Sequence, residues 1–394
     1  MKITHIHIER FRGFQNEDFE VGSLLTAIAG QNGTQKSTLL GIITQTFTLK
    51  TEDSMRVEKP LCGGSYISAF KDKFRLSPTF DKPKGHEWTI SFDAGMDDFT
   101  VESIKRTGDP NVRFWKKGAR QEGDGYISFP TIFLSLKRLV PVAEEAKIIT
   151  DDTLLTQEEL NEFKQLHNKI LIAQTPISSA TTITSKNKQS IGVSTELYDW
   201  NQNSMGQDNL GKIILALFSF KRLHDKYPRQ YKGGILAIDE MDATMYPASQ
   251  VELLKVLRKY ASKLNLQILF TTHSMSLLKA MDDLVQEETK KEETANQAKI
   301  LYLKKVDDKI AIKQGVNFKG IQLDLNVVAE GNNRKKNRIT AYTEDKENIL
   351  FVKAILKSKA FVLDFVDVTL PCSTLMELVT KRVPAFIYPY SIVI

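Results

Sequence analysis

The chain has 394 residues, of which 41% are hydrophobic and 26% charged, and its formal net charge is +6. This composition is typical of a soluble globular protein with room for two or three domains. No apolar stretch is long enough to span a bilayer, and the N-terminus lacks the unbroken apolar core of a signal peptide. Cys62 and Cys372 lie too far apart for a metal-binding spacing. We therefore expect a cytoplasmic protein without a membrane partner.

The first candidate site follows a predicted strand. Residues 3–9 alternate between apolar and polar side chains as a half-buried strand does, and residues 24–30 (LLTAIAG) indicate a second, more buried strand. The second strand runs into GQNGTQKSTLL at residues 30–40, where the apolar residues begin to take helical spacing. Strand, glycine-rich loop and helix are the context in which a phosphate-binding P-loop occurs.

This loop matches the P-loop pattern G-x-x-x-x-G-K-[ST] except that Gln35 replaces the second glycine. Lys36 would reach the β- and γ-phosphates, and Ser37 would place its hydroxyl on Mg²⁺. Gln35 is unfavourable only if its backbone requires a positive φ. We predict a site for ATP with Mg²⁺, and the loop residues that bind ATP are Gly30, Asn32, Gly33, Lys36, Ser37 and Thr38.

The middle of the chain predicts two insertions. Over about residues 85–140, short alternating runs separated by Gly, Asp and Pro predict an antiparallel sheet. Residues 151–173 predict a helix with a cap at Thr156, and the Ser/Thr-rich residues 175–190 predict a mobile loop. Together these last segments give a helical and loop insertion over about residues 145–200.

Two carboxylates and a histidine follow buried strands in the second half of the chain. Residues 233–240 (GGILAIDE) end in Asp239 and Glu240, and a later strand, LQILFTTHS, ends at His273. The carboxyl ends of parallel strands form the ligand-binding edge of such a sheet. We predict that Asp239 holds Mg²⁺ through water, that Glu240 polarises the attacking water as a catalytic residue, and that His273 bonds the γ-phosphate.

A polar Ser-x-Gly-Gln turn precedes an apolar helix in residues 203–220 (NSMGQDNLGKIILALFSF). In this place in the chain it resembles the signature loop of ABC-type ATPases, which binds the γ-phosphate held by a second subunit. The resemblance implies that Ser204, Gly206 and Gln207 bind ATP in trans. It also implies a homo-oligomer built from head-to-tail ATPase dimers.

These motifs in this order, led by IERFRGFQ, resemble the ABC ATPases of the SMC, RecF and OLD group. GQNGTQKSTLLG, GQDNLGKI and IDEMDATMYPASQ are more specifically similar to the PtuA-type ATPases of the Septu anti-phage defence system, which tolerate residues other than glycine before the P-loop lysine. The resemblance covers roughly residues 1–320. It implies a sensor and regulator subunit that binds and hydrolyses ATP and gates a partner HNH nuclease of the PtuB type. The glutamine loop of the family falls near FLSLKRL, with Arg138 as a candidate nucleotide contact.

The predicted fold is α/β: a P-loop ABC-type ATPase domain over residues 1–330 with the two insertions, a charged linker at 331–338, and a small α/β unit over 338–394. ITAYTEDKENILFVKAIL puts Glu344 at a strand end, which is similar to the start of a TOPRIM domain in OLD-family nucleases. There a D-x-D on a later strand joins the glutamate to bind the catalytic metals. No D-x-D follows before Ile394, so we expect this unit to be incomplete and do not expect nuclease activity from the chain as given.

Two other functions stay open. One is an OLD-family ATP-dependent nuclease with a truncated TOPRIM domain, and the other is a RecF-like DNA-repair ATPase. DNA is a candidate partner in each case, because basic clusters occur at residues 113–120, 221–232 and 333–338. Phosphate contacts from such clusters give DNA affinity that depends on salt and not on sequence.

Overall fold

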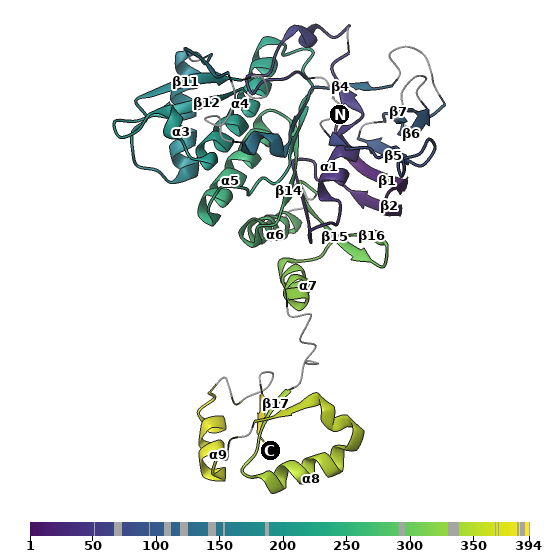
Figure 1. Cartoon of the computed structure of the whole chain (residues 1–394), viewed down its shortest axis with the longest axis vertical. Helices are drawn as coiled ribbons and strands as arrows, with labels where there is room; N and C mark the ends of the chain where they lie inside the picture. The colour runs from purple at the N-terminus through teal and green to yellow at the C-terminus, as the bar shows by residue number, and fades with distance from the viewer. Residues whose placement is uncertain are drawn as a thin grey trace. The chain divides into compact units, whose positions relative to one another are not determined.

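The computed structural model describes residues 1–394 except 51, 67–72, 94, 106–111, 119–124, 141–146, 153, 186–188, 291–295, 330–338, 367, 369, 384–385, 387–390 and 394. The chain forms two compact units, Met1–Gln322 and Leu323–Ile394 (Figure 1). The boundary between them falls within helix α7 (Phe318–Ala329). The expected linker at residues 331–338 lies outside the described residues.

A six-stranded sheet in which five neighbouring strands are parallel forms the centre of the larger unit. Across the sheet the strands are β16 (Lys309–Lys313), β15 (Ala298–Val306), β3 (Leu25–Gly30), β14 (Leu266–Thr272), β13 (Gly234–Ile238) and β9 (Thr131–Leu134). Every residue of β3, β13 and β14 is buried, as expected for continuous apolar runs in a parallel sheet that is covered on both faces.

The strand β9 corrects the boundary of the first predicted insertion. Thr131–Leu134 pairs in parallel with β13 and forms the edge of the central sheet, although the sequence predicted an antiparallel insertion up to about residue 140. A four-residue apolar run carries no information about the direction of its partner, which is why the sequence pattern misplaced it. Nearby, β8 (Ile127–Ser128) forms a short parallel pair with β4 (Phe47–Thr48).

A second, antiparallel sheet joins the first strands of the chain to residues 87–116. Its order is β2 (Phe14–Glu20), β1 (Ile3–Phe11), β5 (Glu87–Phe92), β6 (Phe99–Lys105) and β7 (Val112–Lys116). Burial alternates along β5 and β6, so one face of this sheet packs on the core and the other faces solvent. The inserted strands therefore extend a sheet that the N-terminus begins.

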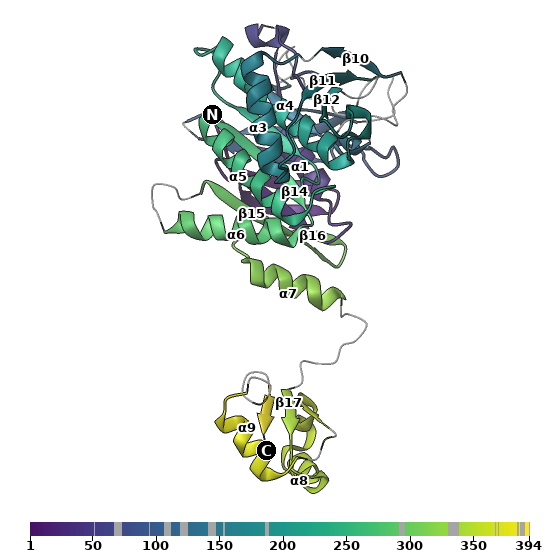
Figure 2. The same ribbon diagram turned by 90° about the vertical axis from the view of Figure 1, so that its left-hand side faces the viewer.

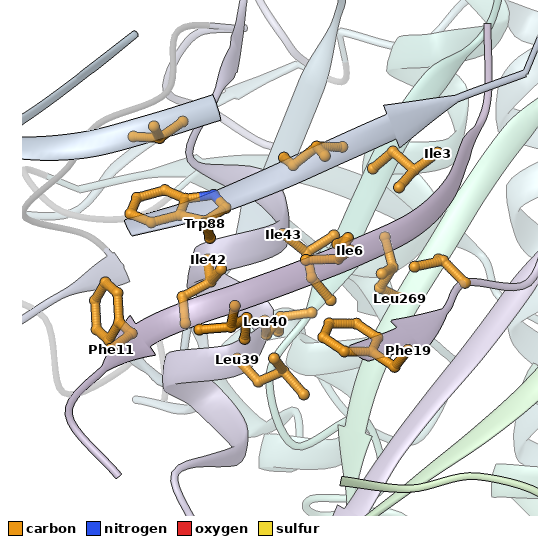
Figure 3. Close-up of a cluster of buried hydrophobic side chains, with 14 of the residues drawn as sticks. Ile3, Ile6, Phe11, Phe19, Leu39, Leu40, Ile42, Ile43, Trp88 and Leu269 are labelled. Atoms are coloured by element: carbon orange, nitrogen blue, oxygen red, sulfur yellow. The ribbon is translucent and has the colours of Figure 1, made fainter. Parts of the chain in front are cut away.

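The helix α1 (Lys36–Thr44) packs into the core between the two sheets. Figure 3 shows its apolar side chains beside those of β1, β2, β5 and β14; the labelled residues are Ile3, Ile6, Phe11, Phe19, Leu39, Leu40, Ile42, Ile43, Trp88 and Leu269. Full burial of one such aliphatic side chain stabilises the fold by about 1.5–3 kcal/mol. The first turn of α1 is thereby fixed against both sheets, and the loop before it is held at the end of β3.

Helices cover the side of β14 that faces away from the antiparallel sheet (Figure 1). They are α3 (Gln157–Leu171), α4 (Met205–Lys226) and α5 (Pro247–Lys263), which lie side by side in Figure 2, and α6 (Met275–Thr289) packs on α5 and β15. The predicted cap is present: Thr156 and Glu159 form a capping box at the start of α3. Short 3₁₀ turns lie at η1 (Ser54–Val57), η2 (Leu136–Leu139) and η4 (Trp200–Gln202).

The predicted mobile loop at residues 175–190 is wrong, because residues 179–184 and 189–190 belong to strands. β10 (Ile149–Asp152), β11 (Ser179–Thr184) and β12 (Gln189–Ser194) form an antiparallel sheet whose last strand packs on α4. The Ser and Thr content suggested a loop, but threonine is β-branched and suits strands. In β11 the side chains of Ala180, Thr182 and Ile183 are buried.

The smaller unit contains a three-stranded parallel sheet with order β18-β17-β19. Its elements are β17 (Ile339–Tyr342), α8 (Lys346–Leu356), η6 (Lys357–Val362), β18 (Leu363–Phe365), α9 (Cys372–Thr380) and β19 (Ser391–Val393). In the part of the chain that the structure describes, none of the helices combines the length and the apolar character that crossing a bilayer requires.

Candidate nucleotide-binding site

The predicted site residues follow three neighbouring strands of the central sheet. β3 pairs in parallel with β14, and β14 pairs in parallel with β13, so their carboxyl ends meet at one edge. The loop after β3, the carboxylates after β13 and the histidine after β14 are brought together there. This edge is where ligands bind in open parallel sheets.

The backbone of the loop takes the turns that a P-loop needs. Gly30 has φ 152° and Gly33 has φ 81°. A Cβ on Gly30 would lie 2.5 Å from the carbonyl oxygen of Leu303, so this position also requires glycine for space. Gln35, where the pattern has glycine, has φ 62° and ψ 32° and is the N-cap of α1. A non-glycine residue therefore occupies a left-handed position, which is disfavoured.

Lys36 starts α1 and its ammonium folds back onto the loop. Its Nζ donates to the carbonyl oxygens of Gly30 and Gln31, at 3.0 Å each. Burial lowers the pKa of this lysine, while the negative charges of Glu240, Asp239 and Asp242 act in the opposite direction. The ammonium is thus held on the backbone of the loop, in which Asn32 and Gly33 are exposed.

Asp239 follows β13 and connects its end to the first turn of α1 and to β14. Its Oδ1 accepts from the hydroxyl of Ser37 at 2.8 Å and from the hydroxyl of Thr271 at 2.7 Å. The two expected Mg²⁺ ligands, Ser37 and Asp239, therefore lie in direct contact. Thr271 is a member of the site that the sequence did not indicate. Threonine in a buried strand such as β14 is ordinary, so its position before His273 was the only signal.

Glu240 has a left-handed backbone, with φ 49°. Its N–H donates to the Thr271 hydroxyl at 2.6 Å, and its carbonyl accepts from Nη2 of Arg138 at 2.8 Å. Its side chain is half-buried. Both backbone polar groups of Glu240 are therefore hydrogen-bonded, while its side chain is only partly buried.

His273 lies at the carboxyl end of β14 and its side chain is exposed. Partial removal of the ring from water, followed by the charge of Lys36, lowers the pKa of His273 from its ordinary value, so the imidazole is mainly neutral at pH 7. The backbone N–H of His273 donates to Oδ1 of Asp242 at 3.3 Å. Asp242 is a second residue that the sequence interpretation left out, although it stands in the IDEMD run that contains the other two carboxylates.

The Ser-x-Gly-Gln turn forms the N-terminus of α4. Ser204 is the N-cap and makes a capping box with Gln207, whose side-chain amide also donates to the hydroxyl of Tyr198 at 2.8 Å. A Cβ on Gly206 would lie 2.6 Å from the carbonyl oxygen of Thr244, so glycine allows α4 to approach the turn after β13. The signature-like loop therefore packs on the turn of its own chain that carries Glu240.

Arg138 has partners that differ from the expected nucleotide contact. Its side chain is 2% exposed. Its Nε donates to Oδ1 of Asn209 at 2.7 Å, and its other nitrogens donate to the carbonyls of Leu134, Ser135 and Glu240. A side chain whose nitrogens are used in this way within the protein does not face a ligand. The prediction that Arg138 touches nucleotide is therefore wrong in this structure.

The remaining candidates are Glu344 and the three basic clusters, none of which belongs to the segments that form this edge. Glu344 follows β17 and its Oε1 accepts from the N–H of Cys372 at 3.3 Å. Within the described residues no three His, Cys, Asp or Glu side chains gather as a metal-binding group. In the basic cluster 221–232, Lys221, Arg222 and Lys226 form ion pairs with glutamates. Residues 119–120 and 333–338 of the other clusters lie outside the described residues.

Comparison with known proteins supports the ATPase interpretation. Residues 133–278 match the family model of the AAA ATPase domain, a segment that runs from β9 into α6 and contains Asp239, Glu240 and His273 but not the P-loop. No relative was found among the curated proteins.

Several solved structures are similar to the chain. The SMC head domain from Thermotoga maritima has 14% sequence identity and a TM-score of 0.43, covering 80% of this chain and 100% of that chain. An SMC head bound to the C-terminal winged-helix domain of ScpA has 14% identity and a TM-score of 0.48, covering 82% and 100%. The recombination mediator RecF has 10% identity and a TM-score of 0.40, covering 80% and 98%. At these values the similarities do not establish a function. Together with the P-loop at the end of β3, the family match supports a P-loop ATPase domain similar to the AAA ATPase domain family.

Proposed function

We propose that the chain binds and hydrolyses ATP at the edge of the central sheet. The observation that carries this proposal is the contact of Ser37 with Asp239 at 2.8 Å, which joins the P-loop helix to the end of β13. The ammonium of Lys36 lies on two backbone carbonyls of the P-loop. An incoming phosphate offers that ammonium stronger, charged acceptors than the two carbonyls.

The donor set of the site suits Mg²⁺. This ion prefers oxygen ligands, keeps several waters, and is held in nucleotide sites by one or two carboxylates and substrate phosphates. Ser37 and Asp239 supply a hydroxyl and a carboxylate oxygen in contact with each other. When bound, Mg²⁺ would neutralise charge that develops on the phosphates. Thr271 would keep Asp239 oriented, because its hydroxyl already donates to the same carboxylate oxygen.

Glu240 is the residue that we assign to activation of water. The hydrogen bonds that hold Glu240 to Thr271 and Arg138 use its backbone N–H and carbonyl, so they leave its carboxylate available for water. His273, mainly neutral at pH 7, would donate a hydrogen bond to the γ-phosphate from the next strand. The N-terminus of α4, with Ser204, Gly206 and Gln207, would complete the site of a second subunit in a head-to-tail dimer.

The role in the cell that we propose is that of an ATPase subunit in an anti-phage defence complex, which senses infection and gates a partner HNH nuclease of the PtuB type. This part rests on the similarity of the P-loop, the turn before α4 and the IDEMDATMYPASQ stretch to PtuA-type ATPases. The ATP-bound and ATP-free forms would differ in assembly, and a ligand shifts such an equilibrium only by its difference in affinity for the two forms.

The ATP site is tested with Lys36→Met in the full chain. We expect loss of ATP binding, measured with a fluorescent ATP analogue, and loss of phosphate release. Lys255→Met is the matched control, since Lys255 is an exposed α5 lysine that pairs with Glu252 on the same helix. Equal ATP affinity in the Lys36→Met variant and the parent would contradict the site.

The nuclease partner is tested by plasmid cleavage with Mg²⁺ or Mn²⁺, with and without ATP. The chain alone should not cleave, and an HNH partner should cleave in a way that depends on the ATP state of this chain. Nicking by the chain alone that is lost in Glu344→Ala would instead support the OLD-like nuclease. ATP hydrolysis stimulated by DNA without cleavage, even with the partner present, would support the RecF-like alternative.

A further inference from the structure

Arg138 is a buried cation that the proposed chemistry does not use. Its guanidinium bonds Asn209 and three backbone carbonyls, all of them neutral, and among the described residues no carboxylate lies within ion-pair distance of it. Burial lowers its pKa to about 10, while the negative charges of Asp239, Glu240 and Asp242 act in the opposite direction, so the side chain is still charged at neutral pH. Removing a charge from water is costly, and here no carboxylate of the described residues is in direct contact to offset that cost. The geometry of its hydrogen bonds indicates what the buried guanidinium does.

One end of this guanidinium bonds the backbone of Glu240. The carbonyl of Glu240 accepts from Arg138 Nη2 at 2.8 Å, and its N–H donates to Thr271 at 2.6 Å. The left-handed φ of 49° is uncommon for a residue with a side chain, and it persists only where the surroundings hold it. Here the side chains of Arg138 and Thr271 bond it, and the backbone N–H of Ala243 also donates to the Glu240 carbonyl at 3.1 Å.

The other end of the guanidinium bonds helix α4. Nε of Arg138 donates to Oδ1 of Asn209 at 2.7 Å, and Nδ2 of Asn209 donates to the carbonyl of Ala243 at 3.0 Å. Asn209 is fully buried and lies on the same helix as the turn that begins at Ser204. A shift of α4 along or across its axis would therefore move both Arg138 and the turn after β13.

We propose that Arg138 and Asn209 are positioning residues that couple the placement of Glu240 to the position of helix α4. This inference rests on the proposed function, in which the N-terminus of α4 contacts ATP held by the partner subunit. ATP bound by one subunit would then set the water-activating carboxylate of the other. Hydrolysis in the dimer would depend on both sites being filled.

The test compares Arg138→Lys and Asn209→Ser with the parent chain. Lysine keeps the charge but cannot bond Asn209 and the Glu240 carbonyl with one planar fork. We expect ATP affinity within about twofold of the parent, ATP-driven dimers that still form, and a kcat lower by about ten- to a hundredfold, as for a small displacement of a reacting group. The control is Arg222→Lys. Arg222 is a partly exposed arginine of α4, the helix that carries Asn209, and it forms an ion pair with Glu159. The kcat of this variant should match that of the parent.

The outcomes separate this inference from the proposed function. Parent-like kcat in both Arg138→Lys and Asn209→Ser, with ATP bound, would overturn the positioning role and leave the ATPase proposal intact. A drop in ATP affinity that accounts for the whole loss of kcat/KM would also overturn it, because Arg138 would then act in binding. A parent chain that binds no ATP would overturn the proposed function and this inference with it. If Arg138→Lys does not fold, Asn209→Ser alone decides, since it removes the link between Arg138 and α4 while the arginine itself is kept.

Discussion

At the scale of single residues, Gln35 shows how a departure from a motif is accommodated. The position takes the left-handed backbone that glycine serves in the usual pattern, with φ 62°. A left-handed residue with a side chain costs roughly 1–2 kcal/mol, and glycine recovers part of this at the expense of chain entropy. The loop is therefore strained without losing its shape, and the sequence motif can vary while the site remains.

Two substitutions at this position test that strain. Gln35→Gly should leave the free energy of unfolding equal or up to about 1 kcal/mol higher, with ATP affinity retained. Gln35→Val should lower the free energy of unfolding by about 1–2 kcal/mol, because a β-branched side chain fits the left-handed region worst. Denaturant titrations give both values. A valine variant as stable as the glycine variant would show that the position is not left-handed.

His167 on α3 gives a pH dependence that is independent of the ATP site. Burial lowers its pKa to about 4, and in the part of the chain that the structure describes its Nε2 has no hydrogen-bond partner. The folded pKa lies below the unfolded value near 6.5, so the unfolded chain binds the proton first as the pH falls. Stability contributed by the neutral form is present above pH 6.5 and declines toward pH 4. Between pH 7 and pH 5 this residue costs about 2 kcal/mol.

His167→Leu should remove that part of the pH dependence. The measurement is the free energy of unfolding of parent and variant at both pH values, with the other titrating groups common to the two. The parent should lose about 2 kcal/mol more than the variant. Equal losses would mean that the ring is accessible to solvent in the folded chain.

The residue-scale roles show what the sequence could and could not predict. Lys36, Ser37, Asp239 and His273 were indicated because each stands at a fixed place relative to a strand end. Thr271 and Asn209 were not, because a threonine in a strand and an asparagine in a helix have no such signature. Their contacts depend on which elements meet in three dimensions, and Arg138 was misassigned for the same reason.

At the scale of elements, the N-terminus of α4 combines a structural cap with the proposed contact in trans. Ser204 caps α4, and Thr156 caps α3 through the same type of capping box. Loss of either hydroxyl should cost about 1 kcal/mol of stability. The two helices thus offer a matched pair in which the cap is the same and the proposed role differs.

Ser204→Ala and Thr156→Ala should therefore lose similar stability but differ in activity. We expect ATP-driven dimers and ATP turnover to be lost in Ser204→Ala only, because its hydroxyl and the N-terminal N–H groups face the partner's phosphate in the proposed dimer. Sedimentation with ATP and phosphate release measure the two effects. Equal turnover in the two variants would remove the role in trans.

The element scale also shows where sequence patterns reach their limit. The parallel strands before the P-loop and before Asp239 were predictable from continuous apolar runs with glycine or carboxylates at their ends. β9 and the strands β11 and β12 were not, since a short apolar run does not reveal its partner and threonine-rich segments suit both loops and strands. Pairing is decided by the neighbours that a segment meets.

At the scale of the whole molecule, the site joins the start of the larger unit to its second half. β3 (Leu25–Gly30) meets at one edge with β13 (Gly234–Ile238) and β14 (Leu266–Thr272), which follow each other in the chain. The α/β class and the order of the nucleotide motifs followed from the sequence. The joining of the N-terminal strands with residues 87–116 into one sheet did not, because it depends on long-range pairing of β1 with β5.

The most direct test of the central claim is Glu240→Gln in the full chain, assayed with ATP and Mg²⁺. The amide cannot accept a proton from water, so phosphate release should fall by about a hundredfold or more while ATP binding is retained. ATP-bound dimers should accumulate and be visible by sedimentation. Turnover equal to that of the parent, or a variant that stays monomeric with ATP bound, would contradict the account of Glu240 and of the dimeric site.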